Sequence, residues 1–225
     1  VTGPLGKKIT ATWGAMGDGI TAVIEMARSS GLALVPLEHR DPLSSTTYGV
    51  GETIIAALDE GFRRFIMGIG GSATNDGGAG MAQAIGVGLK NSAGDPLPFG
   101  GAALADLASI DMSGLDPRVK ESTFLVACDV SNPLTGPEGA STVYGPQKGA
   151  SPQMVDQLDE ALGHLARIVG REIGVDIDQL KGSGAAGGLG GGMVAFLGAD
   201  LRTGVDIVLD VVGIDAHLDG ADLVV

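Results

Sequence analysis

The chain has 225 residues, 39 of them glycine, and a formal net charge of −13. A length in this range fits one large domain with a self-supporting core. The strongly acidic balance argues against nucleic acid as a partner, because nucleic acids reward basic surfaces. No basic-then-apolar leader and no apolar run of about 20 residues is present, so we expect no membrane partner. The single cysteine, Cys128, rules out an intramolecular disulfide and favours a reducing compartment such as the cytoplasm.

The first half of the chain predicts a hairpin, two helices and a buried strand. Residues 8–15 and 21–26 are β-prone and flank an Asp-Gly pair, which predicts an antiparallel hairpin. Residues 48–60 predict a helix, and residues 65–69 predict a short buried strand that runs into a glycine turn. A further helix continues to Ile85, with Thr74 or Asn75 as its N-cap. Residues 91–101 form a turn-rich surface segment.

The second half predicts two strands and three helices. Residues 124–130 are the most strand-like in the chain, and Ser151 followed by Pro152 predicts the start of the longest helix. The glycine-dense loop 182–192 leads into a helix that ends near Gly198, and residues 205–212 predict a buried helix. Residues 222–225 look like a strand that ends just before its loop. We therefore expect an α/β fold in one domain spanning residues 1–225, with a mixed sheet, an antiparallel hairpin and flanking helices.

The segment 68–80 is the richest candidate for chemistry. A strand, a glycine turn and a helix start place free N–H groups around one point, which suits a phosphate or carboxylate. Asp76 is a candidate metal ligand or catalytic carboxylate. A purely structural alternative is that the glycines only allow the helix and strand to pack closely. The candidate anion-binding residues are Gly70, Gly71, Ser72, Thr74, Asn75, Gly77 and Gly78.

The same segment also matches the fingerprint of nicotinamide dinucleotide sites through Gly68, Gly70 and Ala73. That fingerprint requires an acidic residue after a second strand, about 20 residues on, where this chain has its turn-rich segment. A Walker A lysine is absent too, because Lys148 is followed by glycine rather than by serine or threonine.

Asp129 lies at the end of the predicted strand 124–130 and is the second candidate for metal binding or catalysis. Ligands of open α/β sheets gather at the carboxyl ends of strands, but an Asx turn against Pro133 would explain the same residue. Asn132 and Lys148 are candidate phosphate ligands, and so are Gly187 and Gly188 in the second glycine loop. Cys128 is expected to be buried and inert, and the three histidines show no metal-ligand spacing.

Taken together, these segments resemble the bacterial glycerate kinase family. The resemblance rests on the sequence at 68–80 and on Thr-Thr-Tyr-Gly-Val-Gly-Glu, Ala-Cys-Asp-Val, Gly-Pro-Gln-Lys-Gly-Ala and Gly-Ala-Ala-Gly-Gly-Leu-Gly, and it extends from one end of the chain to the other. It implies phosphorylation of D-glycerate by ATP, with Mg²⁺ as cofactor and 2-phosphoglycerate as product. It also implies a two-domain enzyme in which this chain is an inserted domain and a flavodoxin-like domain is its partner.

The family's Asp-Ser-Phe-Lys and Thr-Gly-Glu-Gly-Arg segments are missing from this sequence. The resemblance therefore predicts that the isolated chain has no appreciable kinase activity. Two other classes remain open, a non-catalytic anion- or nucleotide-binding module and a nicotinamide-dependent oxidoreductase. The sequence does not predict the oligomeric state.

Overall fold

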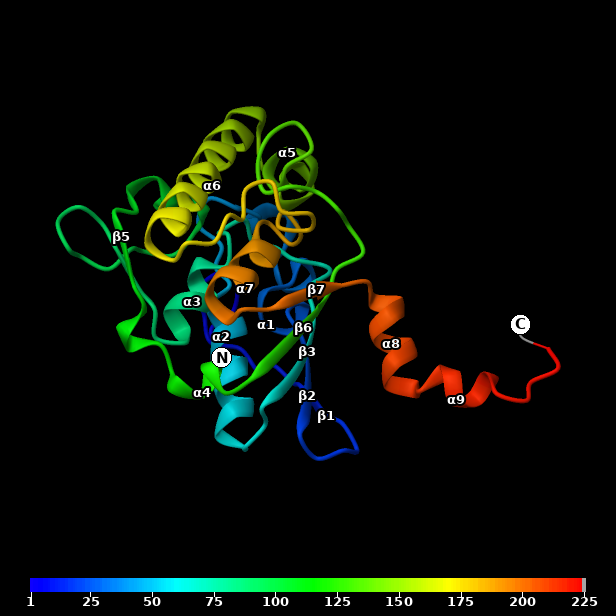
Figure 1. The fold of residues 1–225 in the computed structure, drawn as a ribbon. Coiled ribbons are helices and arrows are strands. Elements are labelled where there is room, and N and C mark those ends of the chain that lie inside the picture. The colour runs from blue at the N-terminus through cyan, green and yellow to red at the C-terminus, as the bar shows by residue number, and fades with distance from the viewer. Residues whose placement is uncertain (224–225) are drawn as a thin grey trace.

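A five-stranded mixed sheet organises the computed structural model, in which residues 1–223 are described (Figure 1). The strand order is β1-β2-β3-β6-β7, with β1 and β2 antiparallel and the remaining neighbours parallel. A separate antiparallel pair is formed by β4 and β5. The predicted mixed sheet with a hairpin and flanking helices is confirmed. The strands are β1 (Gly14–Ala15), β2 (Thr21–Glu25), β3 (Arg64–Gly68), β4 (Gly88–Lys90), β5 (Ser109–Asp111), β6 (Thr123–Ala127) and β7 (Asp200–Arg202).

Nine α-helices are present in the described part of the chain, and several are a single turn long. Short 3₁₀ segments occupy 32–34, 37–39, 101–106, 112–114 and 146–148. The helices are α1 (Ala27–Ser30), α2 (Tyr48–Asp59), α3 (Ala79–Ala84), α4 (Pro117–Lys120), α5 (Ala140–Tyr144), α6 (Pro152–Glu172), α7 (Leu189–Leu197), α8 (Gly204–Val212) and α9 (Ile214–Leu218).

The two faces of the sheet differ in how they are covered. Along β3, Phe65 and Met67 are buried while Ile66 is only partly covered, and Phe124, Val126 and Leu125 repeat this alternation on β6. The buried side chains join one core cluster with apolar residues of α2, α3, α6 and α7. One face therefore supports the core, as the period of two along a half-buried strand predicts.

The predicted α2 and α6 are confirmed, including the start of α6. The Ser151 hydroxyl accepts a hydrogen bond from Met154 N at 3.3 Å, and Pro152 occupies the first helical position. Because proline there lacks only an N–H that would have no helical partner, Ser-Pro is an efficient start.

Several local predictions were wrong. Neither Thr74 nor Asn75 caps α3, which begins at Ala79 after Gly78 in the left-handed region (φ 78°). The loop first turns into the interior, so both polar side chains are fully buried. Within 8–15 only Gly14 and Ala15 pair in a strand, because the preceding residues form their own turn through a bridge between Thr2 and Lys8.

Two predictions near the end of the chain also need correction. Residues 205–212 do form a helix, but Ile207 is the only buried residue of α8, because the helix leaves the body of the molecule. Asp222 and Leu223 are not in a strand, and the rest of the predicted strand, 224–225, lies outside the described residues.

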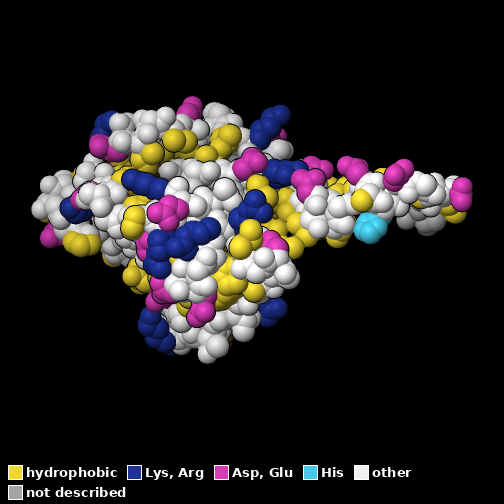
Figure 2. All heavy atoms as spheres, turned by 60° about the horizontal axis from the view of Figure 1, so that its bottom comes forward, with side chains coloured by type: hydrophobic (Ala, Val, Ile, Leu, Met, Phe, Trp, Pro, Cys, Tyr) yellow, Lys and Arg dark blue, Asp and Glu magenta, His cyan; other side chains and the backbone are white. Residues whose placement is uncertain are grey.

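The last two helices form an arm, defined here as residues 204–218. Figure 1 shows α8 and α9 extending away from the body, and Figure 2 shows acidic side chains along them. Within residues 1–223 no helix is both long enough and apolar enough to cross a bilayer.

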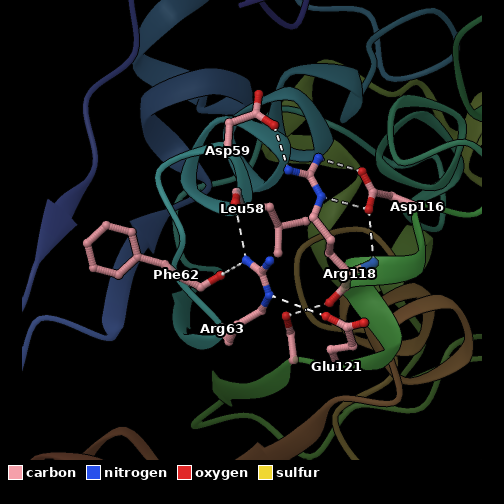
Figure 3. Close-up of polar contacts among 8 residues, drawn as sticks. Leu58, Asp59, Phe62, Arg63, Asp116, Arg118 and Glu121 are labelled. Carbon is pink, nitrogen blue, oxygen red and sulfur yellow. Dashed lines mark hydrogen bonds and ion pairs between the residues drawn. The ribbon is translucent and has the colours of Figure 1, made fainter.

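The amino ends of the parallel strands are held by two arginines (Figure 3). Arg118 donates to Asp59 and to both carboxylate oxygens of Asp116, at 2.7 to 2.9 Å. Arg63 donates to the carbonyl oxygens of Leu58 and Phe62 at 3.1 and 2.8 Å. These bonds tie the end of α2 to the start of β3 and to α4, and Arg118 is paired with the carboxylates of Asp59 and Asp116.

Candidate active site

A cavity of about 250 Å³ lies beyond the carboxyl ends of β3 and β6. Four separate segments surround it: the loop after β3, the residues after β6, the stretch around α5 and the second glycine loop. This is where parallel α/β sheets bind ligands. The lining residues are Ile69, Gly70, Gly71, Ser72, Ala127, Cys128, Asp129, Val130, Tyr144, Gln147, Ala185 and Ala186.

The loop after β3 presents three consecutive backbone N–H groups. Those of Gly70, Gly71 and Ser72 donate no hydrogen bond to another residue within 1–223, and the Ser72 hydroxyl makes none in that range either. The carbonyl of Gly71 is fixed by Leu32 N at 2.8 Å, and Gly71 itself has φ 75°. A run of N–H groups at such a turn forms a concave site for an anion. The geometry thus supports the predicted role of these three residues.

Asp76 lies behind this loop rather than in the cavity. Its carboxylate is 1% exposed and accepts bonds from Thr47 N and Thr47 Oγ1, both at 2.8 Å. It also accepts from Gly78 N at 3.2 Å and Gly80 N at 3.3 Å. Because Thr47 precedes α2 and Gly78 precedes α3, one carboxylate satisfies the first N–H groups of two helices. Burial raises the pKa of Asp76, and the bonds from Thr47, Gly80 and Gly78 oppose that rise.

Asp76 therefore occupies a position in which its oxygens already have partners, and its predicted metal or catalytic role stays a prediction. Among residues 1–223, His, Cys, Asp and Glu side chains nowhere gather in threes around a point that could hold a metal ion.

Lys148 is also behind the cavity. Its side chain is 1% exposed, and Nζ donates to the carbonyl oxygen of Thr74 at 2.7 Å. Burial lowers the pKa of Lys148 to about 7, with the Asp76 carboxylate acting in the opposite direction. The expectation of a loop lysine that offers its charge to phosphate does not match this position, because the ammonium group faces the protein interior. In this structure the lysine side chain fixes the backbone of the loop after β3 at Thr74, and its predicted role as a phosphate ligand stays a prediction.

Asp129 is the exposed carboxylate of the cavity. Its Oδ1 accepts from Gly204 N at 2.8 Å, so its partner is the start of α8 and not the turn before Pro133. Oδ2 makes no hydrogen bond among the described residues. One carboxylate oxygen is thus held and the other has no partner among the described residues, an arrangement open to a cation or to a substrate hydroxyl.

Asn132 does not line the cavity but fixes a residue that does. Its Oδ1 accepts from the Tyr144 hydroxyl at 2.7 Å, and its Nδ2 donates to Glu138 O at 2.7 Å. Tyr144 and Gln147 are lining residues that the sequence did not single out as ligands. The adjacency of Gln147 to Lys148 in a proline- and glycine-fixed loop was the available signal for one of them, and nothing local marked Tyr144.

The two glycine loops are packed against each other behind the cavity. Gly77 N donates to Gly187 O at 3.0 Å, and a Cβ on Gly187 would lie 2.0 Å from the carbonyl oxygen of Thr74. A Cβ on Gly188 would lie 2.9 Å from Gly77 Cα. Gly77, Gly78, Gly187 and Gly188 thus permit close packing of the two loops, and their predicted role as ligands of an anion stays a prediction. Gly70 and Gly71 remain the ones at the cavity.

Ala186, between these loops and the cavity, has φ 55° and is the only described non-glycine residue with a positive φ. Such a conformation costs on the order of 1 kcal/mol and is often retained at ligand sites. Four side-chain polar atoms are buried without a hydrogen-bond partner among residues 1–223, and three of them belong to these loops: Thr74 Oγ1, Asn75 Oδ1 and Ser183 Oγ; the fourth is Arg40 Nε. Strain and unpaired polar atoms in these loops indicate that they are shaped for more than stability.

Cys128 departs from its expected burial, since it is only half-buried and lines the cavity. Its Sγ lies 3.3 Å from the carbonyl oxygen of Val130, and burial raises the pKa of the thiol. A raised pKa keeps the sulfur protonated near neutral pH, which is unfavourable for a nucleophile.

Comparison with known proteins identifies the family. The model of the Glycerate kinase family matches residues 1–225. The chain belongs to the glycerate kinase family. It is 52% identical to a glycerate 2-kinase of Escherichia coli (strain K12) and 55% identical to a glycerate kinase of Bacillus subtilis (strain 168), in both cases over the whole chain. The predicted family resemblance is confirmed.

A solved structure shares the fold of this glycerate kinase chain. A protein of Salmonella typhimurium LT2, described as a glycerate kinase 2, is 54% identical, with a TM-score of 0.96 over 99% of this chain. The chain covers 59% of that structure and 59% of the two curated relatives named above. The relatives thus carry a substantial part of their length outside the matched region.

Proposed function

We propose that these residues form part of an enzyme that transfers the γ-phosphoryl group of ATP to D-glycerate, giving 2-phosphoglycerate. The observation that carries the proposal is the cavity at the carboxyl ends of β3 and β6, which is lined both by three residues whose N–H groups have no partner among residues 1–223 and by the exposed Asp129. Phosphoryl transfer depends mainly on positioning and charge stabilisation, and this cavity offers groups for both.

We assign the N–H groups of Gly70, Gly71 and Ser72 to an anionic group, either a phosphate or the glycerate carboxylate. Asp129 would accept the proton of the attacking hydroxyl or hold a cation. Thr74, Asn75, Asp76 and Lys148 would act from behind, by fixing the loop that carries the N–H groups. The glycines at 77, 78, 187 and 188 would keep the two loops in contact.

A Mg²⁺ ion is compatible with this set of residues. Magnesium in such enzymes is commonly held by one or two carboxylates together with substrate phosphates, and Asp129 offers one free carboxylate oxygen at the cavity. When bound, the ion would neutralise charge on the phosphates. We further propose that the reaction takes place in the cytoplasm, since a single cysteine favours a reducing compartment.

The size of the cavity favours a role for a further domain. About 250 Å³ is below the roughly 300–1,000 Å³ of typical ligand pockets, so these residues enclose only part of what ATP and glycerate need. We therefore propose that a flavodoxin-like partner domain completes the site and that the 225-residue chain binds an anion without turnover. This combines the kinase and the binding-module interpretations for the isolated chain.

The test is product formation from ATP and D-glycerate by the longer polypeptide and by the 225-residue chain, followed by ³¹P NMR. We expect 2-phosphoglycerate from the longer polypeptide and none from the chain. Formation of 3-phosphoglycerate would refute the assigned product. Turnover by the chain alone would refute the shared site. Failure of the longer polypeptide to phosphorylate glycerate would refute the function.

A further inference from the structure

Helix α8 is unusually apolar for a helix at the surface. Its nine residues include four valines, one isoleucine and one leucine, and Asp206 and Asp210 are its only charged residues. One side faces the body: Ile207 is buried, and Val211 borders a cavity of about 460 Å³ over the exposed face of the sheet. A helix that is apolar on nearly all sides belongs in an interior.

The opposite side of α8 faces solvent. Val205, Val208, Leu209 and Val212 stand at i, i+3, i+4 and i+7, and they are 60%, 58%, 37% and 49% exposed. This spacing places all four on one stripe of the helix, called the α8 stripe below. Such a stripe is what an amphipathic helix normally buries, so it marks a contact surface.

The position of α8 is fixed at both of its ends. Thr203 Oγ1 accepts from Asp206 N at 3.2 Å, and Asp129 accepts from Gly204 N at 2.8 Å. Arg202 pairs with Asp210 at 2.7 Å, which holds the helix against β7. These contacts hold α8 in an orientation in which the α8 stripe faces solvent, and a rotation that buried the stripe would break them.

The relatives indicate what covers the stripe. The Salmonella typhimurium structure aligns with 99% of this chain, so almost every residue of the arm has a counterpart in a chain of which this one covers 59%. The polypeptides that share α8 thus contain a large additional part. A second copy of the chain is less suitable, because four side chains on a nine-residue helix offer far less than the roughly 800 Å² per partner of a standard interface.

We propose that the α8 stripe is the docking surface for the part of the same polypeptide that lies outside residues 1–225 in the relatives' alignment. Docking within one polypeptide avoids the loss of translational freedom that association of separate molecules requires. A small apolar contact is therefore sufficient. The docked part places an apolar surface on Val205 and Val208, and the neighbouring carboxylates of Asp206 and Asp215 favour a basic rim around it. The proposal does not depend on which reaction the protein catalyses.

The experiment compares maleimide labelling of Val208→Cys in the 225-residue chain and in the longer polypeptide. Labelling is followed by peptide mass spectrometry, which separates the new thiol from Cys128. We expect labelling at least about tenfold slower in the longer polypeptide, because the thiol reacts only when the docked part opens locally. Ser92→Cys, at an exposed position of the turn-rich segment 91–101, is the matched control and is expected to react equally fast in both.

Val205→Cys provides a second position on the stripe in case Val208→Cys impairs folding. Equal labelling of both stripe positions in the two polypeptides would overturn the proposal. Protection that increases with protein concentration, with a dimer in light scattering, would also overturn it in favour of a second copy. Intact protection in a longer polypeptide that does not phosphorylate glycerate even without the cysteine substitutions would count against the proposed function alone.

Discussion

Polar groups at the two ends of the parallel strands differ in whether they have hydrogen-bond partners within the protein. At the amino ends, Arg63 and Arg118 donate hydrogen bonds to carbonyl and carboxylate oxygens of neighbouring residues (Figure 3). At the carboxyl ends, the N–H groups of Gly70, Gly71 and Ser72 have no partner among the described residues, and one oxygen of Asp129 is free. Polar groups that are paired with one another contribute to stability. Those that are left without partners beside a cavity are available to a ligand.

The same contrast holds for glycine. Gly61, near the amino ends, has φ 92° and open space around a Cβ position, so its glycine serves only the turn after α2. Gly187, behind the cavity, has φ 72° and no room for a Cβ. At the carboxyl ends of the strands, glycine is therefore needed because two backbones lie close together, and not only because a turn requires a positive φ.

The largest expected effect is that of Gly187→Ala on stability. Its Cβ would lie 2.0 Å from Thr74 O, and strain together with overpacking should lower the free energy of unfolding by about 3 kcal/mol. Gly61→Ala is the matched control, since only its φ is unfavourable, and we expect a loss of about 1 kcal/mol. Urea unfolding of both variants measures the difference. Equal losses would show that the close packing of the two loops is dispensable.

Asp129→Asn should reduce kcat of the longer polypeptide on the order of 10²-fold or more, if the carboxylate accepts a proton or holds a cation. Asparagine keeps an oxygen for Gly204 N, so stability should change little. Asp116→Asn at the amino ends is the control and should leave kcat unchanged. Steady-state kinetics of both variants show whether kcat depends on the carboxylate at the carboxyl ends and not on the one at the amino ends. An unchanged kcat in Asp129→Asn would mean that this carboxylate has no part in the reaction and serves only to hold the start of α8.

Lys148 makes stability depend on pH. Its pKa falls from 10.5, the ordinary value of a lysine side chain in water, to about 7 in the folded chain, so between these values the unfolded state binds more protons. Stability therefore rises with pH through this window, by up to about 1.4 kcal/mol per pH unit, and the contribution is flat below pH 7.

Lys148→Met removes that dependence while keeping a long side chain. The measurement is urea unfolding of both proteins at pH 7, 8 and 9, and the difference between them should grow in favour of the wild type. Parallel curves would mean that the lysine ammonium group keeps its charge in the folded protein.

The smallest effect is expected from Arg118→Lys at the amino ends. Lysine keeps the charge but cannot form the forked contact with Asp116, and the site is partly open to solvent. We expect a fall in Tm smaller than that of Gly61→Ala and no change in kcat. A loss of activity here would contradict the division of roles between the two ends.

The sequence predicted most of the scaffold because its signals are local. Ser151 and Pro152 define the start of α6 through groups three residues apart, and the alternation along β3 and β6 follows from one buried face. The arm is the counterexample. Residues 205–212 have the composition of a buried helix, and only tertiary packing, which composition does not record, shows that most of them face solvent.

The candidate site was predicted in part for the same reason. Four of the predicted residues line the cavity: Gly70, Gly71, Ser72 and Asp129. They could be predicted because strand ends and glycine turns are visible in the local sequence. The interior position of Asp76 depends on Thr47, 29 residues earlier, and that of Lys148 on Thr74, 74 residues earlier. No local pattern encodes such pairings, and so their roles as supports emerged only from the fold.

The bond between Asp129 and Gly204 joins the cavity to the root of the arm. A hinge at that point would move a cavity carboxylate whenever α8 is displaced. Reciprocity then applies: a ligand that draws on Asp129 changes the equilibrium of the arm by the same free energy with which the arm changes the affinity for that ligand. A displacement of the arm would thus change the position of the Asp129 carboxylate directly, because a single hydrogen bond joins that side chain to the first residue of α8.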